Sequence, residues 1–276
     1  NRHSKCNTMS PDFIHRITED GLWLEECLNP CWVLNELSRT GMVSTSHTSS
    51  GCKPRNSSFV ESLKACAKKK DLCKGTKVHA DIVKRGLLEK NPYLASSVIH
   101  MYAKCGMLEK AHETHEELCA RNIVSWNALI TAYVRHGLAK EAIECFGRMQ
   151  DEGIRPNPIT FTCILRACSS IGAIEKGSEI HREIVRTDSL KYDIMLATAL
   201  MEMYVGFNML AKAQLVLDEL PVHDSVTWNV LIAGYIDQDR CHEALDCFQC
   251  MQVEGISPDL VSYVYILKAC GNIVSI

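Results

Sequence analysis

Two triplets in this chain carry residue types that could do metal-assisted acid–base chemistry. His115 with Glu117, and His181 with Glu183, both spell H-x-E, in which a zinc-bound histidine precedes a glutamate that moves protons. Such a centre also needs a P-C-x-x-C pair to complete the zinc coordination, and no such pair follows either triplet. We therefore expect no catalytic role for these histidines.

The pair Cys247 and Cys250 has the C-x-x-C spacing of a metal site, but no second ligand pair accompanies it. The sequence also lacks a phosphate-binding Walker loop, a nucleophile elbow and a dinucleotide fingerprint. We expect this chain to be no enzyme and to bind neither a metal nor a cofactor.

Charge and hydropathy narrow the class of partner. The 276 residues carry a net charge of -3 and a pI near 6.4, so any polyanion site has to be a local stripe. Uncharged apolar stretches reach about a dozen residues, fewer than the roughly 20 that span a bilayer. The composition predicts a soluble chain with no membrane segment.

The elements that must position functional residues repeat along the chain. Segments of sequence return after 102 residues without insertion, which is too long a period for one supersecondary unit. The repeated segments are LKAC at 63–66, LRAC at 165–168 and LKAC at 267–270; SWNALI at 125–130 and TWNVLI at 227–232; and RMQDEGIRP at 148–156 and CMQVEGISP at 250–258. We expect a repeat array and not one irregular globule.

The cysteines follow this repeat and not a disulfide framework. Cys66, Cys168 and Cys270 are equivalent, and so are Cys145 and Cys247. A cysteine that recurs at one position of a helical face is most simply a small buried hydrophobe in a reducing compartment. We expect these thiols to be buried and free.

The apolar pattern of residues 123–157 predicts two helices. Residues at i, i+3, i+4 and i+7 from Trp126 form one helical face, and Gly137 supplies a turn. A second apolar face begins at Ala142, and Pro156 follows its end as a helix stop. This segment is therefore expected to be a helical hairpin of 35 residues.

The same reading divides the array into hairpins of 36, 31 and 35 residues. They span residues 56–91, 92–122, 123–157, 158–193, 194–224 and 225–259, with a partial seventh unit at 260–276. One hairpin cannot cover its own apolar face, so neighbours must stack into a continuous core. The prediction is an all-α fold, a right-handed α-solenoid superhelix of stacked helix-turn-helix repeats.

The N-terminal segment, residues 1–55, has a different composition. Residues 40–58 are rich in Ser, Thr and Gly, which predicts a flexible linker. Residues 12–39 could hold a short helical pair, with a degenerate upstream repeat as the alternative. Residue 1 is not Met, and acidic residues in the first twenty do not suit a transit peptide. We expect a fragment whose targeting sequence lies upstream.

The sequence VSWNALITAYVRHGLAKEAIECFGRMQDEGIRPN resembles the pentatricopeptide repeat, with its aromatic-Asn-x-Leu-Ile, turn Gly, Glu-Ala, Phe-x-x-Met and Gly-Ile-x-Pro marks. TFTCILRACSSIGAIEKGSEIH is similar to the long variant of that repeat, and MYAKCGMLEKA to the short variant. Long, short and standard units in strict order mark the plant PLS class of the family. The resemblance covers residues 56–276.

The resemblance implies binding of single-stranded RNA, with one repeat per base. In that family the fifth residue of a repeat and its last residue face one base, which they distinguish by their donors and acceptors. The implied pairs are Ser96 with Asn122 for adenine, Asn127 with Asn157 for cytosine, Thr198 with Asp224 for guanine and Asn229 with Asp259 for uracil. Two pairs specify no base, Thr162 with Asp193 and Val60 with Asn91. The implied register is 5′-n-A-C-n-G-U-3′.

The resemblance also implies stacking and phosphate contacts. Base-stacking residues would be the apolar second residues Val124, Ile159, Met195, Val226 and Val261, together with Tyr93. Position 13, where the family often has a cation, holds Lys68, Lys104 and Arg135, then Ser170, Gly206 and Asp237. Attraction to phosphate is therefore expected mainly in the first half. Residues 206–208 also depart from the first short repeat, which puts the turn there in question.

Alternatives remain at two levels. Asn, Asp, Ser and Thr near helix starts are also favoured simply as N-caps and turn residues. A similar solenoid can grip peptides, which would make the chain a protein-binding scaffold. The resemblance favours the recognition tract of a mitochondrial or chloroplast C-to-U RNA-editing factor. A deaminase would then come from a missing domain or, in trans, from an editing-complex protein, and RNA stabilisation or splicing is the alternative outcome.

Overall fold

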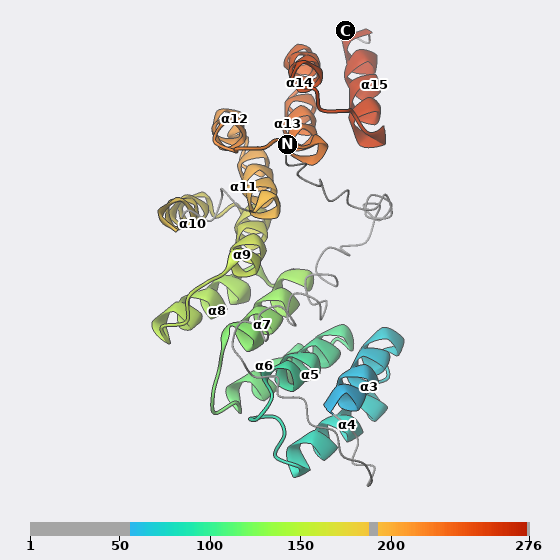
Figure 1. The fold of residues 1–276 in the computed structure, drawn as a ribbon, viewed down its shortest axis with the longest axis vertical. Helices are drawn as coiled ribbons and strands as arrows, with labels where there is room; N and C mark the ends of the chain where they lie inside the picture. Colours follow the sequence, from blue (N-terminus) through green and yellow to red (C-terminus); the bar gives the residue numbers. More distant parts are fainter. Residues whose placement is uncertain (1–55, 188–192, 275–276) are drawn as a thin grey trace, which may run out of the picture. The chain divides into compact units, whose positions relative to one another are not determined.

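The computed structural model describes residues 56–187 and 193–274, so the linker and helical pair expected within residues 1–55 lie outside the described residues. All regular structure in these two ranges is helical (Figure 1). The helices are α3 (Asn56–Lys69), α4 (Leu72–Lys84), α5 (Pro92–Lys104), α6 (Leu108–Glu116), α7 (Ile123–Arg135), α8 (Ala139–Asp151), α9 (Pro158–Ile171), α10 (Ile174–Arg186), α11 (Ile194–Gly206), α12 (Leu210–Asp218), α13 (Ser225–Asp237), α14 (Cys241–Val253) and α15 (Leu260–Val274). None of them is long and apolar enough to cross a membrane.

The described helices form successive hairpins that stack in chain order (Figure 1). The first helix of each hairpin packs against the first helix of the next, from α3 and α5 through to α13 and α15. Each second helix packs against its own partner, and most also touch the following hairpin, as α8 touches α9. The predicted all-α solenoid of helix-turn-helix units is confirmed.

The first described helix begins at residue 56, where the repeat division starts the array, and so inside the Ser- and Thr-rich stretch read as a linker. Residues 56–58, which fall in the Ser- and Thr-rich stretch expected to be a linker, belong to the first turn of α3. Ser and Asn are common in linkers, but they are also favoured at helix starts, where they compete for free backbone N–H groups. Composition alone therefore could not distinguish the end of a linker from the start of a helix.

The apolar stripes read from the sequence form a shared core. In the hairpin of α7 and α8, Trp126, Phe146 and Met149 are fully buried. Phe146 also meets Phe161 of α9, with ring centroids 6.4 Å apart. Adjacent hairpins therefore close each other's cores, which no single hairpin could do alone.

The turn inside each hairpin contains one residue with left-handed backbone geometry. It is Gly106, Gly137 or Gly172 in three turns, and Lys70, Asn208 or Asp239 in the other three. Asn208 has a φ of 57° where its equivalent one period earlier, Gly106, has 78°. Among residues with a side chain, Asn and Asp are the most tolerant of this region. The second short repeat therefore keeps a left-handed turn despite its different sequence.

Four of the five repeat-related cysteines are buried as predicted, namely Cys66, Cys145, Cys168 and Cys247. Burial raises the pKa of the Cys145 and Cys247 thiols to about 12, so both remain protonated. The prediction is wrong for Cys270, which is exposed. Its equivalent, Cys168, lies on α9, which α10 covers, whereas no helix of the described ranges follows α15 to cover it in the same way.

Candidate nucleic-acid interface

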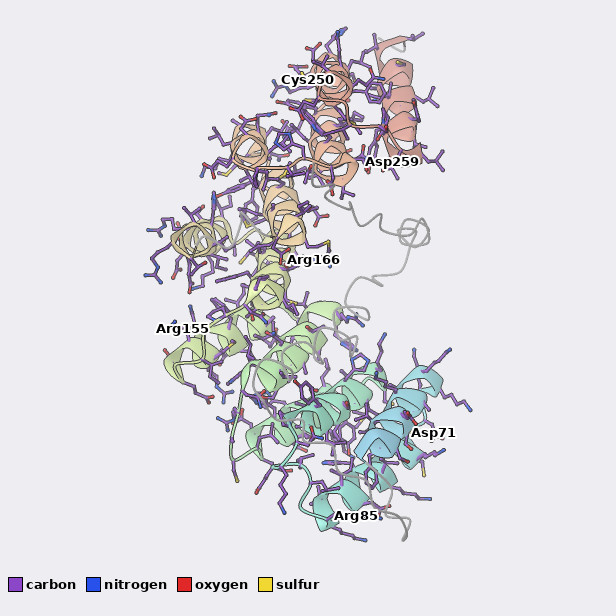
Figure 2. The ribbon with its side chains drawn as sticks, in the orientation of Figure 1. Asp71, Arg85, Arg155, Arg166, Cys250 and Asp259 are labelled. Carbon is purple, nitrogen blue, oxygen red and sulfur yellow. The ribbon has the colours of Figure 1, made fainter. Side chains whose placement is uncertain are left out.

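The last residue of each repeat caps the helix that opens the next one. Asn157 Oδ1 accepts the backbone N–H of Thr160 at 3.0 Å, and Asp259 Oδ1 accepts that of Ser262 at 2.8 Å. Four further caps do the same, Asn91, Asn122, Asp193 and Asp224. Figure 2 shows Asp259 in the segment that leads into α15. The N-cap role of these residues is thus confirmed, and it fixes each of them at the junction of two repeats.

In the two standard repeats, the predicted base-reading side chains touch each other. Asn127, the fifth residue of its repeat, donates from Nδ2 to Asn157 Oδ1 at 3.1 Å. One period later, Asn229 Nδ2 lies 3.1 Å from Asp259 Oδ1 and 3.3 Å from Oδ2. Packing of successive first helices therefore brings the start and the end of one repeat to a single point.

The short and long repeats arrange their predicted pairs differently. Ser96 Oγ and Thr198 Oγ1 donate to backbone carbonyls of their own helices, at 3.1 and 2.8 Å. Their hydrogens are thus directed away from the caps. In the described ranges no hydrogen bond joins Ser96 to Asn122, Thr198 to Asp224 or Thr162 to Asp193.

Capping leaves different groups available on Asn157 and Asp259. Asn157 uses its amide oxygen on α9 and on Asn127, so its Nδ2 group remains a donor. Asp259 has only acceptors, and its Oδ2 accepts from Ser225 Oγ at 3.0 Å. Partial burial acts to raise the Asp259 pKa, but hydrogen bonds led by the Ser262 N–H outweigh it and hold the pKa below its usual value. The two junctions therefore share a geometry but present opposite hydrogen-bonding groups.

The apolar second residues stand in the first turn of the first helices, beside the caps. Val124, Ile159, Val226 and Tyr93 are half-buried, and Met195 and Val261 are exposed. Each junction from the first short repeat onward is therefore accompanied by accessible apolar surface, as a stacking contact requires.

The candidate phosphate-binding cations lie near the C-terminal ends of the first helices. Lys68 is exposed on α3, whereas Lys104 and Arg135, the last residues of α5 and α7, are half-buried. Arg135 Nε and Nη2 are buried without a hydrogen-bond partner among the described residues. At the matching position of α13, Asp237 lies 3.4 Å from Lys268. Both charge signs thus occur at this position along the array.

A further set of buried hydroxyls was not expected from the sequence. The third residues of four repeats, Ser125, Thr160, Thr227 and Ser262, are all 0% exposed. Thr160 Oγ1 and Ser262 Oγ donate to the amide oxygens of Asn127 and Asn229, each at 2.7 Å. The signal that could have revealed them is a Ser or Thr three residues after four of the six caps, the spacing of a capping box.

The histidines of the H-x-E triplets have structural roles. His115 is fully buried against Trp126, with ring centroids 4.2 Å apart, and burial lowers its pKa to about 4. His181 Nδ1 lies 2.7 Å from the hydroxyl of Tyr204 on the next hairpin. The described ranges also bring together no set of His, Cys, Asp and Glu side chains that could hold a metal ion. These histidines join hairpins to each other.

Comparison with known sequences places the repeats in a family. The model of the PPR repeat family matches residues 121–170 and 223–272, and the PPR repeat model matches 94–123. A chloroplastic pentatricopeptide repeat-containing protein of Arabidopsis thaliana is 34% identical over 76% of this chain and 40% of its own length. A mitochondrial one from the same plant is 32% identical over 78% of this chain and 31% of its own length. The chain therefore spans less than half the length of these curated relatives.

Solved structures have the same fold. The crystal structure of the pentatricopeptide repeat protein PPR10 from maize matches 90% of this chain and 36% of its own, with a TM-score of 0.66 at 20% identity. PPR10 in complex with an 18-nucleotide psaJ RNA element matches 87% of this chain and 40% of its own, with a TM-score of 0.52 at 17% identity. Taken with the stacked hairpins and the matched repeats, these findings show that the chain belongs to the pentatricopeptide repeat family.

Proposed function

We propose that this chain binds single-stranded RNA and reads one base per repeat, in the order 5′-n-A-C-n-G-U-3′. The observation that carries the proposal is the pair of standard-repeat junctions. Asn127 with Asn157 and Asn229 with Asp259 have the same contact and spacing, and they differ only in the last residue. A base-by-base code needs this kind of difference, in which one changed side chain alters the hydrogen-bonding groups at an otherwise equal site.

The chemistry of the two junctions suits two different pyrimidines. Cytosine has an acceptor at N3, whereas uracil has a donor there. The Nδ2 donor of Asn157 matches cytosine, and the ionised acceptor of Asp259 matches uracil. The half-buried Val124 and Ile159 would stack on the bases.

Affinity for the RNA backbone would come from the cationic positions. Lys68, Lys104 and Arg135 succeed one another at the ends of α3, α5 and α7. Neutralised phosphates release counterions, so binding should weaken steeply with salt. Because Asp237 occupies the matching position of α13, the 5′ half of the site should contribute most of this term.

The full protein would be an organellar RNA-processing factor of the PLS class, acting in C-to-U editing. Support comes from the long, short and standard units in order, and from relatives named chloroplastic or mitochondrial. The maize relative of similar fold was crystallised with an RNA element. The deaminase would be supplied by another part of the protein or by an editing-complex partner. RNA stabilisation and splicing use the same recognition and are the alternative outcomes.

A protein-binding scaffold is the rival from a different class. A groove that grips peptides would be lined by apolar or uniformly acidic side chains. The junctions of this chain instead carry amides, hydroxyls and carboxylates whose combination changes from repeat to repeat. That variation favours RNA over a peptide as the ligand.

The test is binding to short RNAs that contain ACnGU or the same bases scrambled, measured by fluorescence anisotropy. We expect tighter binding to the ordered sequence. Asn157→Asp should move the preference of its repeat from cytosine to uracil, and Asp259→Asn should make the reciprocal change. A discriminating hydrogen-bond pair contributes about 1 to 3 kcal/mol by analogy with DNA readout. Equal affinity for ordered and scrambled RNA would contradict the proposal.

A further inference from the structure

Two buried hydroxyls link each standard repeat to the repeat that follows it. Thr160 Oγ1 lies 2.7 Å from Asn127 Oδ1, and Ser262 Oγ lies 2.7 Å from Asn229 Oδ1. In both cases the hydroxyl oxygen also accepts the backbone N–H of the cap, at 3.2 Å. The arrangement recurs after one full period with the same distances, although Thr has been replaced by Ser.

In two other junctions a hydroxyl at the same position makes a different bond. Ser125 and Thr227 are equally buried, and their hydroxyls also accept the backbone N–H of the cap, at 3.1 and 3.2 Å. Each donates, however, to the backbone carbonyl of the cap at 3.0 Å, and not to a side chain of the preceding repeat. A hydroxyl has a single hydrogen to donate. Its acceptor therefore distinguishes junctions in which the hydroxyl bonds to the preceding repeat from those in which it bonds to the cap.

The direction of the hydroxyl is decided by the fifth residue of the repeat before it. Before Thr160 and Ser262 that residue is an asparagine, whose amide oxygen is a strong acceptor. Before Ser125 and Thr227 it is Ser96 or Thr198, whose own hydroxyl turns into its helix. Only the standard repeats therefore have a reading side chain held by the next repeat.

The hydroxyl and the cap together fix the orientation of the asparagine amide, and the asparagine itself is largely buried, Asn127 being 8% exposed and Asn229 6%. An amide has two orientations that exchange its oxygen and its NH2 group, and in this one the oxygen accepts from the Thr160 hydroxyl while Nδ2 donates to Asn157 Oδ1. The Thr160 hydroxyl also lies 3.0 Å from Asn157 Oδ1, but that oxygen already accepts from the Thr160 N–H and from Asn127 Nδ2. Nδ2 has two hydrogens and Asn157 accepts one of them, so Asn127 keeps a second N–H that it can offer to a base.

We propose that Thr160 and Ser262 are specificity-determining positioning residues, each setting the base preference of the repeat that precedes its own. The second N–H of this asparagine suits the O2 carbonyl that cytosine and uracil share. A reversed amide would present an oxygen, which suits the exocyclic amino group of guanine. The unit that selects a pyrimidine is thus the fifth and last residues of one repeat together with the third residue of the next. This inference rests on the proposed RNA binding.

The first test is Thr160→Val, which keeps the shape of the side chain and removes the hydroxyl. Binding is measured on RNAs that carry C, U, A or G opposite residues 123–157. We expect the preference for pyrimidine over purine at that base to fall about tenfold. Thr160→Ser should keep the wild-type preference, because Ser262 makes the same 2.7 Å contact. Ser262→Ala, read at the uracil position, is a second variant and should give the same loss.

The matched control is Thr227→Val, the same substitution at the same position of a junction where the hydroxyl serves only the cap. It should lower the thermal unfolding midpoint about as much as Thr160→Val, and leave the base preference opposite residues 194–224 unchanged. A merely structural hydroxyl would give two variants with equal loss of stability and no change in preference, which would overturn the inference. A wild-type chain with no base preference opposite residues 123–157 would instead refute the proposed function on which the inference rests.

Discussion

Asn229 Nδ2 donates to Asp259 Oδ1 at 3.1 Å, which joins the fifth residue of a repeat to its last residue. The carboxylate that receives this bond also caps α15 through the Ser262 N–H. One side chain therefore does two tasks, because a carboxylate oxygen has more than one lone pair and Oδ1 accepts both N–H groups. Capping therefore leaves this residue able to take the part in base reading that we propose for it.

Reading by Asp259 should be insensitive to mild acid. Its pKa lies below the usual value, so the carboxylate remains an ionised acceptor at pH 5 as at pH 7. We expect the preference for uracil over cytosine at this base to be the same at both values, by anisotropy titration. The stabilisation that this carboxylate contributes is present above the ordinary aspartate pKa and is lost only as the pH falls through the lower folded value. A preference that disappears by pH 5 would contradict the assigned charge state.

His115 should make the array acid-sensitive. Its pKa is lowered from 6.5 to about 4, so below pH 6.5 the unfolded chain binds a proton that the folded chain refuses. Stability should therefore fall between about pH 6.5 and 4, by up to about 3 kcal/mol. His115→Leu should flatten this fall, because Leu217 fills the equivalent position one period later and is fully buried. Urea unfolding at pH 7 and pH 5 measures the loss of stability in the wild-type chain and in His115→Leu. An equal pH dependence in these two proteins would count against the prediction.

Gly234 and Val205 should behave as a compensating pair. A Cβ on Gly234 would lie 2.7 Å from Leu210 Cδ2 and 2.9 Å from Val205 Cγ1, so Gly234→Ala should cost about 1 to 3 kcal/mol by overpacking. One period earlier the same positions hold Ala132 and Ala103, both buried.

The double variant Gly234→Ala with Val205→Ala recreates that earlier pair. We expect it to be more stable than the sum of the two single changes predicts, by about 1 kcal/mol, because Val205→Ala makes room for the new methyl and that methyl fills part of the space left. Thermal unfolding of the four proteins in this cycle gives the coupling. Strict additivity would show that the two positions do not share one space.

Lys70 should be replaceable with a gain in stability. Its φ of 53° places a side-chain-bearing residue in the left-handed region, where the equivalent residue one period later is Gly172 with φ 68°. The strain of the lysine exceeds the added chain entropy of glycine, so Lys70→Gly should stabilise by about 0.5 to 1 kcal/mol. Gly172→Ala is the matched reverse change and should destabilise. The denaturation midpoint reports both, and a loss of stability in Lys70→Gly would contradict the argument.

Local order in the sequence was enough to determine the helices of this protein and how they repeat. Apolar spacing around Trp126 gives a helical face, a left-handed residue such as Gly137 ends it, and Asn157 begins the next helix. Each of these signals acts within a few residues, so it can be recognised from the sequence alone. The same signals supplied the caps that became candidate base readers.

Only the tertiary structure decided how those candidates are used. Thr160 and Thr227 have the same type, repeat position and burial, yet one hydroxyl donates to an amide of the preceding repeat and the other to a backbone carbonyl. The choice depends on a residue 33 positions earlier, brought close by the packing of α7 on α9. Hydrogen-bond direction depends on neighbours from other repeats. Which residues become neighbours is decided only when the hairpins stack on each other.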